Sequence, residues 1–169
     1  MNLPSPSQSP PDAAPYPTPE HPDDALWMQR ALELARAAAA VGEVPVGAVI
    51  VRAGAILAEA HNLTRTDDDP TAHAEMVALR RAARRAASTR LLDATMYVTL
   101  EPCSMCAGAL VLAKVQRLVY AAADPKTGMC GSLGCIVQDR RLNHRLQLTA
   151  GVLAEPAGEL LRGFFRARR

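Results

Sequence analysis

Two cysteines separated by one helical turn constrain this chain more than any other feature. Cys103 directly follows the dipeptide Glu101-Pro102, and Cys106 lies three residues after Cys103. Proline favours the first turn of a helix, so the sequence predicts that both thiols lie in that turn and share one face. The positive end of the helix dipole stabilises thiolate, the form of cysteine that binds metal. Alone, however, a Cys-x-x-Cys pair also fits a redox pair or half of a structural zinc site.

A histidine and a glutamate at the start of another predicted helix complete a candidate site. They are His73 and Glu75, and the chain has no second Cys-x-x-Cys that would close a structural site. Three protein ligands leave the fourth zinc position to water, as in catalytic sites. We therefore expect one Zn²⁺ bound by His73, Cys103 and Cys106, with Glu75 as the proton carrier beside the water.

Each of these residues has a simpler interpretation when taken singly. An isolated His73 would be a hydrogen-bonded core residue, and an isolated Glu75 would be an exposed side chain that stabilises a helix N-terminus. Together they form the pattern H-x-E…P-C-x-x-C, which is the signature of zinc-dependent deaminases. The combination predicts hydrolytic deamination rather than a structural role.

The hydrophobic pattern predicts alternating helices and strands. The expected helices cover residues 24–41, 70–86 and 102–113, and a last one begins near Pro156; the expected strands cover 46–51, 55–61, 95–100, 117–121 and 145–148. In the first helix, Trp27, Ala31, Leu34, Ala38 and Val41 form the expected inner face. This alternation predicts an α/β domain with helices on both faces of one sheet.

The N-terminal segment differs from the rest in composition. Residues 1–24 contain 8 of the 13 prolines and few apolar side chains. Such a segment buries too little surface to offset the entropy of ordering it. We expect a disordered tail over residues 1–24, which is either inert or binds a partner, and one folded domain over residues 25–169.

Charge and hydropathy indicate what kind of partner and which cellular location to expect for the domain. Residues 25–169 carry 19 basic and 13 acidic side chains, which suits an anionic partner such as nucleic acid or serves solubility alone. No run of 18 apolar residues is present and the N-terminus has no apolar signal block, so we expect no membrane partner and a cytoplasmic location.

The chain resembles the cytidine deaminase superfamily and, within it, the bacterial tRNA-specific adenosine deaminases. The resemblance runs from about Leu26 to Arg169 and rests on these segments: 43–49, Asn62, 69–75, 94–108, 124–128, 131–133, 142–145 and 164–169. It implies a three-layer α/β/α sandwich with a mixed central sheet of about five strands, and a homodimer. It also implies that the substrate is a tRNA anticodon loop, in which the wobble adenosine is converted to inosine.

The resemblance also assigns roles to residues outside the metal site. Asn62 would hydrogen-bond the flipped base, and the backbone N–H of Ala74 would help to hold it. Asp124 would lie against the sugar-phosphate, and Lys126 and the C-terminal arginines would lie near RNA phosphates. The expected homodimer contact is the apolar third helix, near Met105, Ala109 and Leu112.

Several features depart from the family pattern or leave alternatives open. His61 stands where a bulky aromatic is familiar, and Cys130 and Cys135 are either free thiols or part of a second metal site. The same zinc chemistry would serve a deaminase of a free base or nucleoside, such as guanine, cytosine or cytidine. A catalytically inactive, zinc-stabilised RNA-binding module is a further alternative, although such a module has no use for Glu75.

Overall fold

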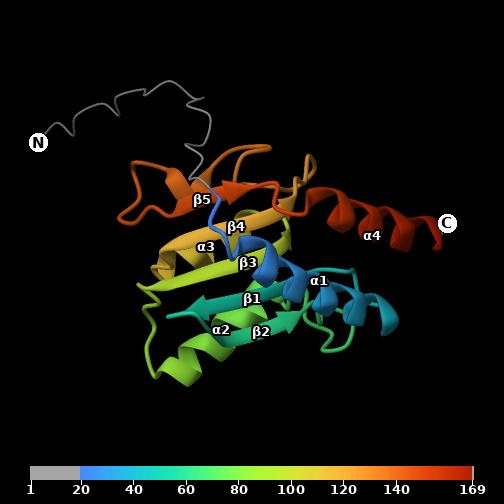
Figure 1. Cartoon of the computed structure of the whole chain (residues 1–169), viewed down its shortest axis with the longest axis horizontal. Helices are drawn as coiled ribbons and strands as arrows, with labels where there is room; N and C mark the ends of the chain where they lie inside the picture. Colours follow the sequence, from blue (N-terminus) through green and yellow to red (C-terminus); the bar gives the residue numbers. More distant parts are fainter. Residues whose placement is uncertain (1–19, 169) are drawn as a thin grey trace, which may run out of the picture.

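A five-stranded mixed sheet lies between two layers of helices in the computed structural model, which describes residues 20–168 (Figure 1). The strands are β1 (Gly47–Arg52), β2 (Ala55–His61), β3 (Ala94–Leu100), β4 (Arg117–Ala122) and β5 (Gln147–Ala150). Their order in the sheet is β2-β1-β3-β4-β5. β1 is antiparallel to both neighbours, whereas β3, β4 and β5 are mutually parallel. This confirms the predicted three-layer fold with a mixed sheet of five strands.

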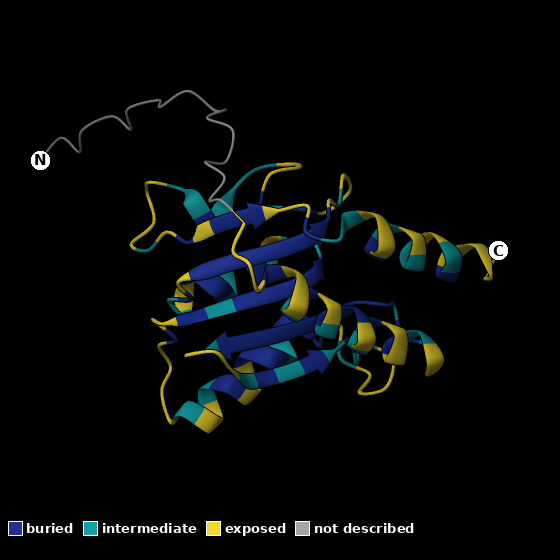
Figure 2. Cartoon of the chain, in the orientation of Figure 1, coloured by how far each residue is buried: buried dark blue, intermediate teal, exposed yellow. Residues whose placement is uncertain are grey.

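Each face of the sheet is covered by two helices. These are α1 (Asp24–Ala40) and α4 (Ala154–Arg166) on one face, and α2 (Ala74–Ala86) and α3 (Ser104–Leu112) on the other. Alternate residues of β1 enter the two cores, with Ile50 facing α2 and α3 and Val49 facing α1. The strands are therefore buried on both sides, and the exposed residues lie mainly on the helices and loops (Figure 2).

Two helices begin later than predicted, and the difference determines the geometry of the site. α2 begins at Ala74 rather than Pro70, and α3 begins at Ser104 rather than Pro102. Before α2, the Asp69 carboxylate accepts hydrogen bonds from the backbone N–H and the hydroxyl of Thr71, so the chain turns here instead of starting a helix. His73 and Cys103 are thus the last extended residues before their helices.

The inner face of α1 is rotated from the predicted one. Met28, Leu32 and Ala35 are buried together with Ala31 and Ala38, whereas Val41 is 65% exposed. Val41 lies beyond the helix end, where Gly42 adopts a positive φ of 86°. The predicted termination at this glycine is confirmed, because only glycine adopts that conformation readily.

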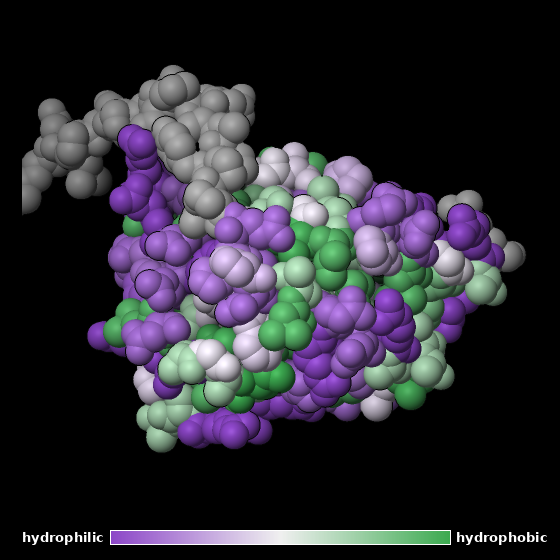
Figure 3. Space-filling model, viewed as in Figure 1, coloured by the Kyte–Doolittle hydropathy of each residue, from purple (hydrophilic) through white to green (hydrophobic). Residues whose placement is uncertain are grey.

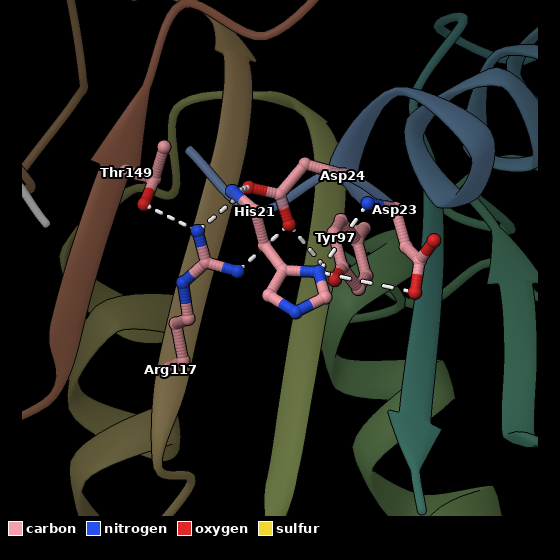
Figure 4. Close-up of polar contacts among 6 residues, drawn as sticks. All are labelled: His21, Asp23, Asp24, Tyr97, Arg117 and Thr149. Carbon is pink, nitrogen blue, oxygen red and sulfur yellow. Dashed lines mark hydrogen bonds and ion pairs between the residues drawn. The ribbon is translucent and has the colours of Figure 1, made fainter. Parts of the chain in front are cut away.

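A buried ion pair ties the start of α1 to the sheet (Figure 4). Asp24, which the sequence analysis placed both at the end of the tail and at the start of the first helix, is the first residue of α1 and has no exposed surface. Its carboxylate accepts a bidentate pair of hydrogen bonds from Arg117 on β4, at 2.7 and 2.6 Å, and a third from the Tyr97 hydroxyl at 3.0 Å. Asp24 therefore belongs to the folded domain, while residues 1–19 lie outside the described residues and their disorder stays a prediction.

The surface over α1 and α4 is mostly hydrophilic, with apolar side chains gathered between the two helices (Figure 3). Leu26 on α1 and Phe165 on α4 are among the exposed large hydrophobic residues. Phe165 is 50% exposed, whereas its neighbour Phe164 is buried. Within residues 20–168, none of the helices combines the length and hydropathy that crossing a bilayer requires.

Candidate metal centre and active site

Two helix N-termini converge on the candidate metal site. His73 is the N-cap of α2 and Cys103 is the N-cap of α3, and both have extended backbones, with ψ values of 150° and 176°. Neither side chain caps its helix, although this position usually carries a capping Ser, Thr, Asp or Asn. Both helices therefore present their positive ends to the site without a side-chain cap, which favours anionic ligands.

The three predicted ligands are brought together in a geometry that suits a metal. The Nδ1 atom of His73 lies 3.7 Å from the Sγ of Cys103 and 3.6 Å from the Sγ of Cys106, and all three ligand atoms lie within 4.8 Å of one another. A tetrahedral zinc ion, with bonds of about 2.3 Å to sulfur and 2.0–2.1 Å to nitrogen, places its sulfur and nitrogen ligands about 3.6 Å apart. The residues present therefore fit a metal of this size and ligand preference.

The two thiols of the site differ in acidity. A hydrogen bond from the Cys106 thiol and a second from His73 lower the pKa of Cys103 to about 4. The hydrogen bond to Cys103, together with burial, raises the pKa of Cys106 well above its ordinary value. The hydrogen bond with Cys103 also raises the pKa of His73. One thiolate is thus already favoured by the protein, which prepares the site for a cation.

Glu75 is almost completely buried next to these ligands. Its side chain is 4% exposed, and it lies in the first turn of α2. Burial is the main reason that the pKa of Glu75 is raised above its usual range. A buried carboxyl group with a raised pKa is suited to receive and return a proton.

Asn62 and Ala74 lie together beside the candidate metal site. The Ala74 N–H donates to the Oδ1 atom of Asn62 at 2.8 Å, and both residues are buried. The Ala74 N–H therefore orients Asn62, and its inferred role in holding the base stays a prediction. The bond fixes the amide so that Nδ2 is the group that Asn62 can offer to a ligand.

Asp124 and Lys126 belong to the loop that follows β4. The Asp124 carboxylate accepts hydrogen bonds from the Lys126 N–H at 2.9 Å and the Thr127 hydroxyl at 2.5 Å. Burial opposes ionisation, but these bonds outweigh it and keep the pKa of Asp124 below its ordinary value. A β-bridge between Cys103 and Gly128 joins this loop to the candidate metal ligands, while the Lys126 side chain is exposed to solvent.

A buried glutamate that the sequence analysis gave no role holds this loop in place. The Glu101 carboxylate accepts hydrogen bonds from the N–H groups of Asp124, Cys130 and Ser132 at 2.9–3.0 Å, and from the Ser132 hydroxyl. A Cβ atom at Gly128 would lie 2.4 Å from that carboxylate, so only glycine fits there. A glutamate directly after an apolar strand and before Pro102 was the available signal for this role.

A second buried glutamate organises the loop on the other side of the site. Glu43 has no exposed surface and accepts hydrogen bonds from the N–H groups of Arg65 and Thr66 and from the hydroxyls of Thr64 and Thr66. These residues follow Asn62 closely in the sequence. Two buried carboxylates therefore fix the two loops that carry the candidate substrate-binding residues.

Comparison with known proteins agrees with this arrangement. A family model for MafB19-like deaminases matches residues 22–169. The tRNA-specific adenosine deaminase of Haemophilus influenzae is 50% identical over 147 residues, which cover 86% of this chain and 85% of that protein. A solved structure from work on A-to-I editing by tRNA:A34 deaminases at the wobble position has a TM-score of 0.78 and 40% identity, covering 80% of this chain and 99% of that chain.

A guanine deaminase structure also matches, over a shorter stretch. The Bacillus subtilis enzyme is 42% identical, with a TM-score of 0.56, and the match covers 58% of this chain and 63% of that chain. The fold, the ligand geometry and the long matches to adenosine deaminases agree, and the chain belongs to the MafB19-like deaminase family, among the tRNA-specific adenosine deaminases.

Proposed function

We propose that this protein converts adenosine to inosine at the wobble position of a tRNA anticodon, with zinc as its cofactor. The observation that carries the proposal is the convergence of His73, Cys103 and Cys106 next to a buried Glu75, in a chain that is 50% identical to a tRNA-specific adenosine deaminase. Two thiolates and one imidazole form a ligand set that zinc prefers. When bound, zinc would lower the pKa of its water ligand towards neutrality.

Glu75 would carry the proton in this reaction. Water adds to C6 of adenine and ammonia leaves, so one proton must pass from the water to the departing amine. Glu75 lies in the first turn of α2, two residues after the helix N-cap His73, and the charges of His73 and Cys103 act on its carboxyl group. Its burial makes the protonated form accessible, so that one group takes the proton and delivers it.

The surrounding loops would select and hold the RNA. Asn62, whose Oδ1 is occupied by Ala74, would donate a hydrogen bond from Nδ2 to the flipped base. Asp124 would lie beside the sugar-phosphate, and the exposed Lys126 would contact phosphate. An anticodon loop is single-stranded, so extruding its base breaks no base pair.

The proposal also includes a homodimer, in which two copies of the chain contact each other through α3. Cys106, Ala107, Leu110 and Val111 of this helix are buried in the domain. Leu112 is 78% exposed, and Met105 and Ala109 on the outer side are only partly covered. An apolar helix with an uncovered side gains stability when a second copy covers it.

The match to a guanine deaminase supports an alternative function, the deamination of a free base, because the same metal centre would serve that reaction. Incubation of the zinc-loaded protein with inosine-free total tRNA, followed by sequencing for inosine, tests the proposal. We expect inosine at wobble adenosines of particular tRNAs. Inosine at no tRNA position would contradict it, and the Glu75→Gln protein serves as the control for contaminating activity.

A further inference from the structure

Cys130 and Cys135 form a second pair of cysteines that the deamination chemistry does not use. Both thiols are free, and a β-bridge pairs the two residues in antiparallel orientation. Cys130 is completely buried and Cys135 is partly exposed. Among residues 20–168 the only cluster of potential metal ligands is the His73 group, so nothing joins these two sulfur atoms to a metal site.

The hydrogen bonds around the bridge define its geometry. The Ile136 N–H donates to the Met129 carbonyl at 2.9 Å, and the Gly131 N–H donates to the Gly134 carbonyl at 2.9 Å. These two bonds flank Cys130 and Cys135, which are therefore a non-hydrogen-bonded antiparallel pair. In such pairs the Cα atoms are about 4.5 Å apart and the side chains are close on one face. Disulfides require a Cα separation of about 4.4–6.8 Å.

This small hairpin is built into the candidate active site. The N–H of Cys130 donates to the Glu101 carboxylate at 3.0 Å, and Glu101 also holds Asp124. The Cys103–Gly128 bridge lies two residues before Cys130. A covalent link across the hairpin would therefore secure the loop that carries Asp124 and Lys126 without requiring a backbone rearrangement.

We propose that Cys130 and Cys135 are an oxidisable dithiol whose disulfide locks the loop after β4. With a small-molecule disulfide such as oxidised glutathione as the oxidant, the Cys135 thiolate attacks one glutathione sulfur and releases one glutathione thiolate. Cys130 then loses its proton and attacks the Cys135 sulfur, which releases the second glutathione. One disulfide is broken and one is formed, and the two protons from the cysteine thiols end on the two glutathione molecules.

The order of these steps follows from burial. Cys135 is the more accessible of the two, and the backbone N–H groups of Gln138 and Val137 partly offset the burial that raises its pKa. Burial is the main cause that raises the pKa of Cys130, and the charge of Cys135 is the second cause. Thiolate is the reacting form, so the cross-link forms slowly and reports sustained oxidation rather than a brief exposure.

A redox titration of the zinc-loaded protein tests the proposal. The protein is equilibrated with mixtures of reduced and oxidised glutathione, quenched in acid, alkylated under denaturing conditions and digested with trypsin. The peptide 127–140 contains Cys130 and Cys135 and no other cysteine, whereas Cys103 and Cys106 lie in the peptide 91–114. We expect the oxidised sample to give peptide 127–140 two hydrogens lighter and without alkyl groups, while peptide 91–114 is alkylated twice.

Thermal unfolding gives a second readout. Closing this short loop should raise the melting temperature by about 5 °C, and dithiothreitol should reverse the increase. The matched Cys135→Ser protein should keep its zinc and show no redox-dependent shift. Two alkyl groups on peptide 127–140 at every redox ratio, or a stable mixed disulfide of Cys135 with glutathione, would overturn the proposal. An unchanged melting temperature in the cross-linked protein would overturn the claim that the loop is locked.

Discussion

Replacement of Asp24 by alanine should destabilise the whole domain, although Asp24 lies at the edge of a proline-rich segment. The change removes a carboxylate that accepts hydrogen bonds from Arg117, Tyr97 and the His21 backbone N–H, all between 2.6 and 3.0 Å. The Arg117 side chain is only 10% exposed, so its charge would remain buried without its carboxylate. Breaking a buried ion pair in this way costs about 3–5 kcal/mol.

The free energy loss translates into a measurable change in thermal stability. A domain of this size loses about 2–4 °C in melting temperature per kcal/mol, so the decrease should be about 6–20 °C. Differential scanning calorimetry or circular dichroism of the zinc-loaded protein measures it. The adjacent Asp23→Ala protein is the matched control, because Asp23 is 61% exposed and its contact with His21 spans 3.8 Å; its melting temperature should hardly change.

The stability that the Asp24 ion pair contributes should decrease at acid pH. Burial raises the pKa of Asp24, but the hydrogen bonds from Arg117 and His21 outweigh it, and the net pKa is lowered. A depressed folded-state pKa gives stability that is present above the unfolded-state pKa, near 3.9, and is lost as the pH falls through the folded-state value. The stability difference between the wild type and Asp24→Asn should therefore shrink below about pH 4.

Two truncated proteins distinguish the effect of the tail on stability from that of the ion pair. Removal of residues 1–19 should leave the melting temperature unchanged, whereas removal of residues 1–24 should lower it as Asp24→Ala does. A loss below about 1 kcal/mol in Asp24→Ala, or an equal loss in Asp23→Ala, would contradict this prediction, because the buried pair would then contribute no more than a surface pair.

Four further predictions concern the site and its surroundings. Glu75→Gln should retain zinc and fold but lose turnover by about 100- to 10,000-fold in single-turnover assays. Cys106→Ala should lose zinc by metal analysis and also lose stability, and full zinc occupancy would remove Cys106 from the ligand set. Glu101→Gln replaces an acceptor of four hydrogen bonds and should cost about 2 kcal/mol of unfolding free energy in denaturant titration. Leu112→Glu should give a monomeric mass in light scattering at concentrations where the wild type is dimeric, and a monomeric wild type would contradict the proposed interface.

The cluster of candidate metal ligands was predictable because its residues lie in short, recognisable sequence patterns. Cys103 and Cys106 are one turn apart, and a histidine near another helix start was the natural third ligand. The exact helix starts were not predictable from Pro70 and Pro102. The extended conformation of His73 depends on the turn stabilised by the Asp69 side chain, and that competition between side chain and helix is invisible to hydrophobic periodicity.

The buried carboxylates show where sequence reasoning fails. Asp24 meets Arg117 across 93 residues, so no local pattern distinguishes it from the exposed Asp23. Glu43 and Glu101 bind mostly backbone N–H groups of loops, which carry no side-chain signature. For Cys130 and Cys135 the sequence left free thiols and a second metal site open, and their pairing follows from a hairpin that only the structure describes.

We propose that the substrate is a tRNA anticodon rather than a free base or nucleoside. The decisive measurement compares initial rates of ammonia release by the zinc-loaded protein on an anticodon stem-loop with adenosine at the wobble position and on free adenosine, guanine, cytosine and cytidine. We expect turnover on the stem-loop that far exceeds that on every free compound and that disappears in Glu75→Gln. Faster turnover of guanine or another free compound, with little on the stem-loop, would contradict the tRNA assignment.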